Sequence, residues 1–126
     1  MATQGQSMLL TNIPLALDEI GTELRTQENL VTAVSCSVSA KVIEATSAAG
    51  SVMKIQYSTD ESTWNDFHAN QINLNSAATQ LTTEEAIPTG AKTSNTYLRL
   101  VTISGDGTTA SNAKIGNVTL NVIYDL

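Results

Sequence analysis

The sequence has one cysteine and one histidine in 126 residues. A single cysteine excludes an internal disulfide and a cysteine-rich zinc site, and a single histidine excludes multi-histidine metal sites and leaves little for acid–base chemistry. Charged residues make up 14% of the chain, against about 25% in an average soluble domain. Six basic residues against twelve acidic ones give a net charge of −6, so no basic stripe is available to bind nucleic acid. The composition therefore indicates a protein that is not an enzyme, holds no metal or other cofactor and has no nucleic-acid partner.

No apolar run in the sequence approaches the ~20 residues that a membrane-spanning helix needs. The N-terminal segment carries no basic residue before its apolar stretch, and Asn12 and Pro14 interrupt that stretch. It therefore lacks the pattern of a secretory signal. We expect no membrane partner, and the lone Cys36 is consistent with synthesis in a reducing cytoplasm.

Small polar residues are abundant, and they accompany a two-residue periodicity. Threonine, serine and asparagine together contribute 40 residues, and a high threonine content with little charge is typical of β-sheets. Apolar and polar residues alternate, or an apolar run is bounded by turn residues, over 30–42, 52–57, 97–103 and 118–124. These patterns predict strands, and we expect 97–103 to be a central strand covered on both faces. Strands separated by turns, without alternating helices, predict an all-β fold, an antiparallel β-sandwich.

The first thirty residues are the part of the chain that a sandwich does not need. Between Leu15 and Leu30, apolar residues recur at three- and four-residue spacing, which predicts at most one short helix. We therefore divide the chain into an extended N-terminal arm, residues 1–30, and a sandwich domain, residues 31–126. The arm either folds back on its own sandwich or packs on a neighbouring subunit. Its candidate assembly contacts are Met8, Leu9, Leu10 and Ile13.

A motif in the middle of the chain carries a resemblance to a known class of proteins. Tyr57 begins the pattern Tyr-Ser-x-Asp-x-Ser-x-Trp, which ends at Trp64, and Tyr97-Leu-Arg-Leu follows some thirty residues later, before a glycine-rich turn at Gly105–Gly107. Together with the preceding alternating strand, this resembles the small jelly-roll modules of tailed-bacteriophage particles, capsid decoration or cement proteins among them. It is also similar to carbohydrate-binding sandwiches. The resemblance covers residues 30–126.

The resemblance implies a structural virion protein, made in the host cytoplasm and located on the capsid surface. Its implied partners are the major capsid protein, whose subunits it bridges, and other copies of itself in a homotrimer. One alternative is a carbohydrate- or receptor-binding module of a phage tail or fibre, with Trp64, Asp60 and Asn65 facing the ligand. Another is a head–tail or tail structural component.

Several side chains have a structural interpretation beside the functional one. A lone tryptophan after a polar turn more often plugs the core than binds a sugar. Arg99 lies in the most apolar strand and needs a partner, for which Asp66 is the candidate. Cys36 falls on the apolar side of its strand and is expected to be buried. His68 has no motif around it, and Asn117 begins a glycosylation sequon that we interpret as chance.

Overall fold

Strands dominate the regular structure of the chain. The computed structural model describes residues 3–11, 15–16, 20–47, 49–67, 71–103 and 113–125, with side chains from residue 28 onward except that of Asn117. The elements are β1 (Thr3–Thr11), β2 (Leu15–Ala16), β3 (Ile20–Glu28), β4 (Ala33–Glu44), β5 (Val52–Ser58), β6 (Asn65–Asp66), β7 (Ile72–Asn73), β8 (Thr79–Leu81), β9 (Glu85–Ala86), η1 (Thr89–Ala91), β10 (Thr96–Ile103) and β11 (Lys114–Asp125). Within these ranges the 3₁₀ turn η1 is the only helical segment, and no helix in them is long and apolar enough to cross a membrane.

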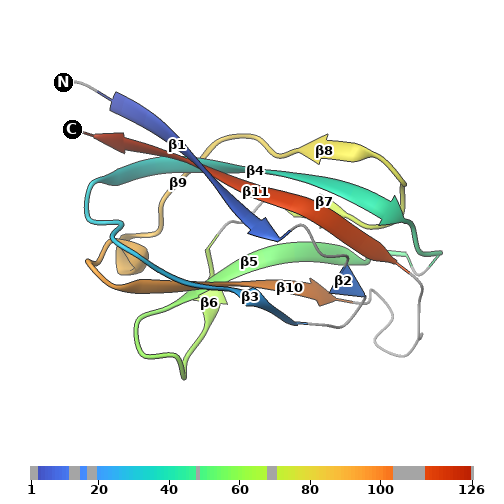
Figure 1. Cartoon of the computed structure of the whole chain (residues 1–126), viewed down its shortest axis with the longest axis horizontal. Coiled ribbons are helices and arrows are strands. Elements are labelled where there is room, and N and C mark those ends of the chain that lie inside the picture. The colour runs from blue at the N-terminus through green and yellow to red at the C-terminus, as the bar shows by residue number, and fades with distance from the viewer. Residues whose placement is uncertain are drawn as a thin grey trace.

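The strands form two antiparallel sheets that lie one above the other (Figure 1). The six-stranded sheet has the order β1-β11-β4-β8, with β2 also pairing with β11 and β9 with β4. The five-stranded sheet has the order β3-β10-β5-β6, with β7 also pairing with β5. The predicted all-β antiparallel sandwich is confirmed.

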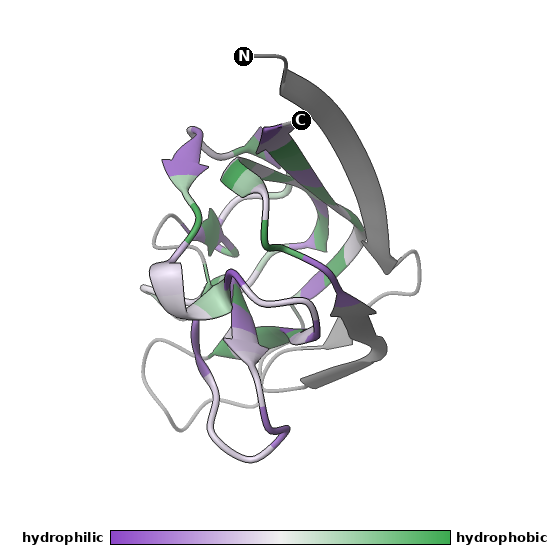
Figure 2. Ribbon diagram, turned by 90° about the vertical axis from the view of Figure 1, so that its left-hand side faces the viewer, coloured by the Kyte–Doolittle hydropathy of each residue, from purple (hydrophilic) through white to green (hydrophobic). Residues whose placement is uncertain are grey.

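The core lies between the two sheets because alternate residues of the long strands face inward. Buried and more exposed residues alternate along β4 and β10, and Figure 2 shows hydrophobic residues on strands of both layers. The largest fully buried side chains are Phe67, Leu30, Met53, Ile55, Ile72, Leu74, Leu98, Leu100, Ile115 and Leu120. The predicted strands at 30–42, 52–57, 97–103 and 118–124 correspond to β4, β5, β10 and β11.

The helix predicted between Leu15 and Leu30 is wrong, because residues 20–28 form strand β3. β3 pairs antiparallel with β10, which offers it a continuous edge of hydrogen-bonding groups. The segment also contains Gly21 and two threonines, which favour a helix poorly, so tertiary pairing outweighs a weak helical periodicity. Together with β1, which pairs with β11, β3 makes the arm of residues 1–30 contribute to both sheets of its own sandwich. A role of these residues at a neighbouring subunit stays a prediction.

The expectation that 97–103 is covered on both faces is also wrong. β10 is central within its sheet, between β3 and β5. Every second residue is buried against the other sheet, whereas Tyr97, Arg99, Val101 and Ile103 are only partly buried. The outer face of the five-stranded sheet is therefore open to solvent around Arg99.

Candidate functional site

The two sheets end in strands of very different length. β1 ends the six-stranded sheet and β3 ends the five-stranded sheet, and each has nine residues. These two strands contact each other across the layers, on one side of the sandwich (Figure 1). The opposite ends of the sheets are formed by β8, of three residues, and β6, of two. The sandwich therefore has one side with long strand edges and one with short edges.

The predicted assembly contacts Met8, Leu9 and Leu10 lie near the C-terminal end of β1. In the register, Met8 is opposite Leu120 and Leu9 is opposite Thr119, and a register shift follows between Leu9 and Thr11. The fourth predicted contact, Ile13, lies outside the described residues. The apolar end of β1 thus belongs to a long sheet edge.

A row of polar side chains crosses three strands on the outer face of the five-stranded sheet. Arg99 on β10 is directly opposite Gln56 on β5, which is directly opposite Asp66 on β6. The Nε and Nη2 atoms of Arg99 donate to Gln56 Oε1 at 2.9 and 2.8 Å, and Gln56 Nε2 donates to Asp66 Oδ1 at 3.4 Å. Lys54 Nζ lies 3.1 Å from the same Asp66 oxygen. We call Arg99, Gln56 and Asp66 the polar row.

The sequence predicts Asp66 as the partner of Arg99, whereas the structure places Gln56 between Arg99 and Asp66. Nothing in the sequence singled out Gln56, although its alternation with Met53 and Ile55 puts it on the outer face of β5. Its amide oxygen accepts hydrogen bonds from both Nε and Nη2 of the Arg99 guanidinium. A bridging amide therefore connects the positive and negative ends of the row.

Trp64 lies against the polar row, not in the core. The Arg99 Cζ atom is 4.3 Å from the centroid of the Trp64 ring, which is a cation–π distance. The indole is partly buried, and Phe67, three residues later, is the aromatic residue that fills the core. The prediction that Trp64 plugs the sandwich is therefore wrong. Its position at the surface had no sequence signal, because Arg99 is 35 residues away along the chain.

The turn before Trp64 is held by side-chain hydrogen bonds from two residues. Asp60 Oδ1 accepts from the backbone N–H groups of Ser62 at 2.8 Å and Thr63 at 2.9 Å, and from the hydroxyl of Ser58 at 2.9 Å. The Ser58 hydroxyl oxygen accepts in turn from the N–H groups of Asp60 and Glu61, and Glu61 has a φ of 62°. The hydrogen bonds from Thr63, Ser62 and Ser58 lower the pKa of Asp60. Asp60 thus organises the turn that presents Trp64.

Asn65, the third residue of the predicted ligand-facing set, is exposed and opposite Tyr57 in the β5–β6 register. Trp64, Asp60 and Asn65 therefore belong to one turn and the short strand after it.

In the described part of the chain, no group of three His, Cys, Asp or Glu residues is placed to hold a metal ion.

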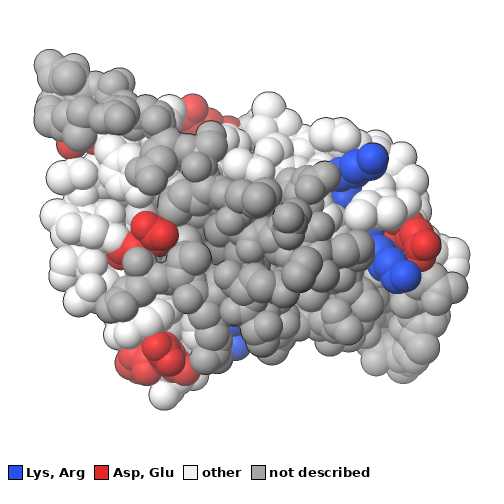
Figure 3. Space-filling model, in the orientation of Figure 1, with Lys and Arg blue, Asp and Glu red and all other residues white. Residues whose placement is uncertain are grey.

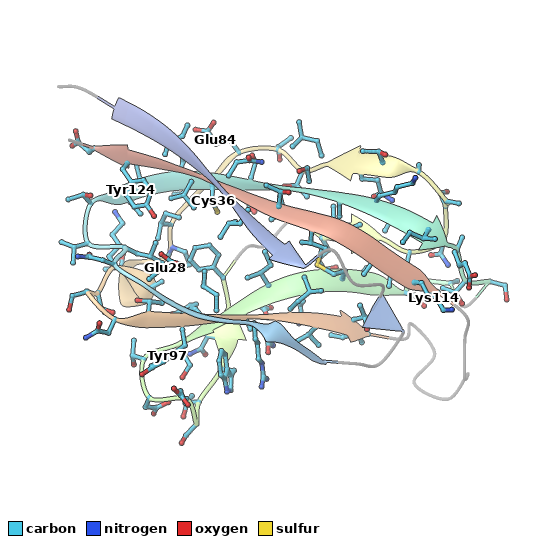
Figure 4. The ribbon with its side chains drawn as sticks, viewed as in Figure 1. Glu28, Cys36, Glu84, Tyr97, Lys114 and Tyr124 are labelled. Carbon is cyan, nitrogen blue, oxygen red and sulfur yellow. The ribbon has the colours of Figure 1, made fainter. Side chains whose placement is uncertain are left out.

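Cys36 is buried in β4 beneath an acidic loop. Burial, with smaller contributions from Glu85 and Glu84, raises the pKa of its thiol from 9.0 to about 12. The hydroxyl of the neighbouring Ser35 donates to Glu84 Oε1 at 2.6 Å. Figure 4 shows Glu84 and Cys36 on the six-stranded layer, far from Lys114. The burial predicted for Cys36 is confirmed, and its raised pKa favours the protonated thiol. His68 lies outside the described residues.

A surface hollow of about 240 Å³ lies where β4 begins and β11 ends. It is lined by Val31, Thr32, Ala33, Val34, Lys92 and Asp125. Asp125 Oδ1 is buried without a hydrogen-bond partner. On the face drawn in Figure 3, the described acidic and basic side chains form small separate groups and no continuous basic patch. The residues that line the hollow come from three distant parts of the chain, so no single stretch of sequence indicates it.

Comparison with known proteins supports the fold. No protein-family model matches the chain, and no curated protein sequence is similar to it. Among solved structures, it is similar to a chain of the infectious bursal disease virus Gx strain, with a TM-score of 0.53 and 14% identity over 97% of this chain and 32% of that one. It is also similar to a chain of the T13 particle of that virus, with a TM-score of 0.54 and 16% identity over 97% of this chain and 31% of that one.

A third similar structure is the VP2 subviral particle of the same virus, with a TM-score of 0.50 and 13% identity over 97% and 32% of the two chains. The present chain thus spans about a third of the length of these proteins. At this level of identity the likeness shows a shared fold. The β-sandwich is therefore one that also occurs in the protein of a viral particle.

Proposed function

We propose that this chain is a structural protein of a virus particle, which binds the outer surface of an assembled bacteriophage capsid and stabilises it. The observation that carries the proposal is the sandwich fold, which matches chains of viral particles over 97% of this chain with TM-scores of 0.53 and 0.54. The low content of charged side chains and the long sheet edges on one side support a role in assembly.

In this proposal the protein is a decoration or cement protein on the capsid surface, made in the host cytoplasm. It acts as a homotrimer at local threefold positions and bridges adjacent major capsid subunits. Each junction adds a modest buried interface, and many such junctions together resist internal pressure. Residues 1–30 contact the capsid, with Met8, Leu9, Leu10 and Ile13 as the assembly contacts, and the rest of the sandwich is the body.

The test combines light scattering of the purified protein with co-sedimentation on undecorated phage heads. The proposal predicts saturable binding at a fixed ratio to the major capsid protein and heads that resist heating better when decorated. Leu9→Lys should weaken binding, and Leu81→Lys, at the exposed residue of the opposite edge strand β8, is the matched control. Heads that show no saturable binding of a correctly folded protein would contradict the proposal.

A second candidate is a carbohydrate- or receptor-binding module, and the position of Trp64 favours it. The indole is partly exposed, at the end of a hydrogen-bonded turn and beside polar side chains, and aromatic rings with nearby polar groups are common in ligand sites. Titration with a panel of glycans, followed by Trp64 fluorescence, separates the candidates. A saturable fluorescence change without binding to heads favours the receptor-binding module.

A further inference from the structure

The strands that end the two sheets differ in how their main-chain edges are protected. An exposed strand edge presents unpaired N–H and C=O groups to any other strand, and proteins usually protect it by shortness, charge or proline. β8 and β6 are only three and two residues long. β3 is long, but it carries Glu23, Arg25 and Glu28. Each of these three edges therefore has a recognised form of protection.

β1 is the exception. Its nine residues, Thr-Gln-Gly-Gln-Ser-Met-Leu-Leu-Thr, include no charged residue and no proline. It pairs with β11 on one side, and on its other side no described residue forms a ladder with it. The β11 residues opposite it are also uncharged from Val118 to Tyr124. A long, uncharged main-chain edge, in unbroken register with β11 from Thr3 to Leu9, is thus open to strand addition.

We infer that β1 pairs antiparallel with β1 of a second copy, so that two six-stranded sheets join across a twofold axis. A twofold interface brings the same surface of both copies together, so every charge at its centre meets a like charge. Copies with a net charge of −6 repel each other. Because β1 has no charged residue, two copies can approach there without placing like charges opposite each other. With Ser7 on the axis, Gly5 lies opposite Leu9, the last residue of β1 before its register shift.

The strand pair alone buries too little surface for a stable dimer, for which roughly 1,000 Å² or more is usual. A weak, concentration-dependent association is therefore expected in solution, strengthened wherever copies are held close together. The inference goes beyond the proposed function, because two copies can pair in this way whether or not a capsid is their final partner. On a capsid, the same contact links neighbouring trimers.

A cysteine at the axis tests the pairing directly. Directly opposite residues of an antiparallel pair have Cβ atoms about 4.5–5.5 Å apart, within reach of a disulfide after small adjustments. The native Cys36 is buried, so the background reaction is low. Ser7→Cys should give a covalent dimer under mild oxidation, whereas Thr79→Cys, exposed on the short edge strand β8 of the same sheet, should give far less.

Two further measurements do not depend on disulfide formation. Ser7→Lys should raise the dimer Kd by about tenfold or more in analytical ultracentrifugation, because it places two lysines opposite each other, and Thr79→Lys should leave it unchanged. Hydrogen exchange of the wild-type protein should show that the β1 amides gain protection as the concentration rises.

Exchange of the β1 amides that is independent of concentration, with equal cross-linking of the two cysteine variants, overturns the inference. Protection of β1 that appears only after phage heads are added, without cross-linking of Ser7→Cys on those heads, also overturns it, because the occupant of the edge is then a capsid protein. If Ser7→Lys binds heads saturably with wild-type affinity, the proposed function is supported, even if the β1–β1 pairing is overturned.

Discussion

Arg99 donates two hydrogen bonds to one oxygen of Gln56, from Nε at 2.9 Å and Nη2 at 2.8 Å, while its Cζ atom lies 4.3 Å from the Trp64 ring. Arg99 and Gln56 are directly opposite each other in the β5–β10 register. A planar guanidinium can donate along its edge and stack on its face at the same time. The Arg99 side chain therefore connects the turn that carries Trp64 to the outer face of the five-stranded sheet.

Arg99→Lys should lower the free energy of unfolding by about 1 kcal/mol, because an ammonium lacks the planar fork and the stacking face. The emission of the single tryptophan should shift to longer wavelength as its environment opens. Denaturant unfolding followed by fluorescence and circular dichroism measures both effects. A double-mutant cycle with Gln56→Ala is the control, and additivity of the two changes within about 0.3 kcal/mol would show that the residues are not coupled.

Asp60→Ala should loosen the turn before Trp64, because it removes the acceptor of three hydrogen bonds. The folded state lowers the pKa of Asp60 below its ordinary value of 3.8. Its stabilising contribution is therefore present above pH 3.8 and lost as the pH falls through the lower, folded-state pKa. Acrylamide quenching of Trp64 should be greater in the variant at neutral pH, and the difference should disappear in strong acid.

The control for this experiment is Glu61→Gln, which removes the adjacent exposed carboxylate and keeps Asp60. Its quenching should follow the wild-type protein across the pH range. Equal quenching of Asp60→Ala and wild type at neutral pH would mean that the turn does not depend on the carboxylate.

The sandwich and its long inner strands could be predicted from the sequence because burial imposes a period of two on β4 and β11. β3 could not, because its conformation depends on pairing with β10, some seventy residues later. Contacts between distant segments also explain why the partner of Arg99 and the position of Trp64 were predicted wrongly. The strand register sets Gln56 between Arg99 and Asp66, and the fold brings Trp64 over Arg99. Neither relationship leaves a pattern in one stretch of sequence.

Leu100→Ala should lower the free energy of unfolding by about 2–5 kcal/mol, because it leaves a cavity between the sheets. Leu100 is 0% exposed at the centre of β10, whereas Leu81 on β8 is 70% exposed. Leu81→Ala should therefore change stability by less than about 0.5 kcal/mol. Urea unfolding of the two variants makes the comparison, and equal losses would contradict the assignment of the core.

Cys36 should not react with Ellman's reagent at pH 8 in the folded protein, and should react fully in denaturant. Burial raises its pKa from 9.0 to about 12, and the thiolate is the reactive form. The folded state therefore holds the proton more tightly than the unfolded state. The stabilisation this provides is complete below pH 9 and is lost as the pH rises towards 12, at no more than about 1.4 kcal/mol per pH unit.

Cys36→Ala isolates this contribution from those of other groups that titrate in the same range. One of these is Tyr124, whose pKa is raised by burial and by Glu28. The wild-type protein should lose stability relative to the variant above pH 9, and the difference between them should be constant below that pH. Denaturant titrations from pH 7 to pH 11 give both curves. Parallel curves across the whole range would show that the thiol ionises equally easily in the folded and unfolded chains, which its burial in β4 does not allow.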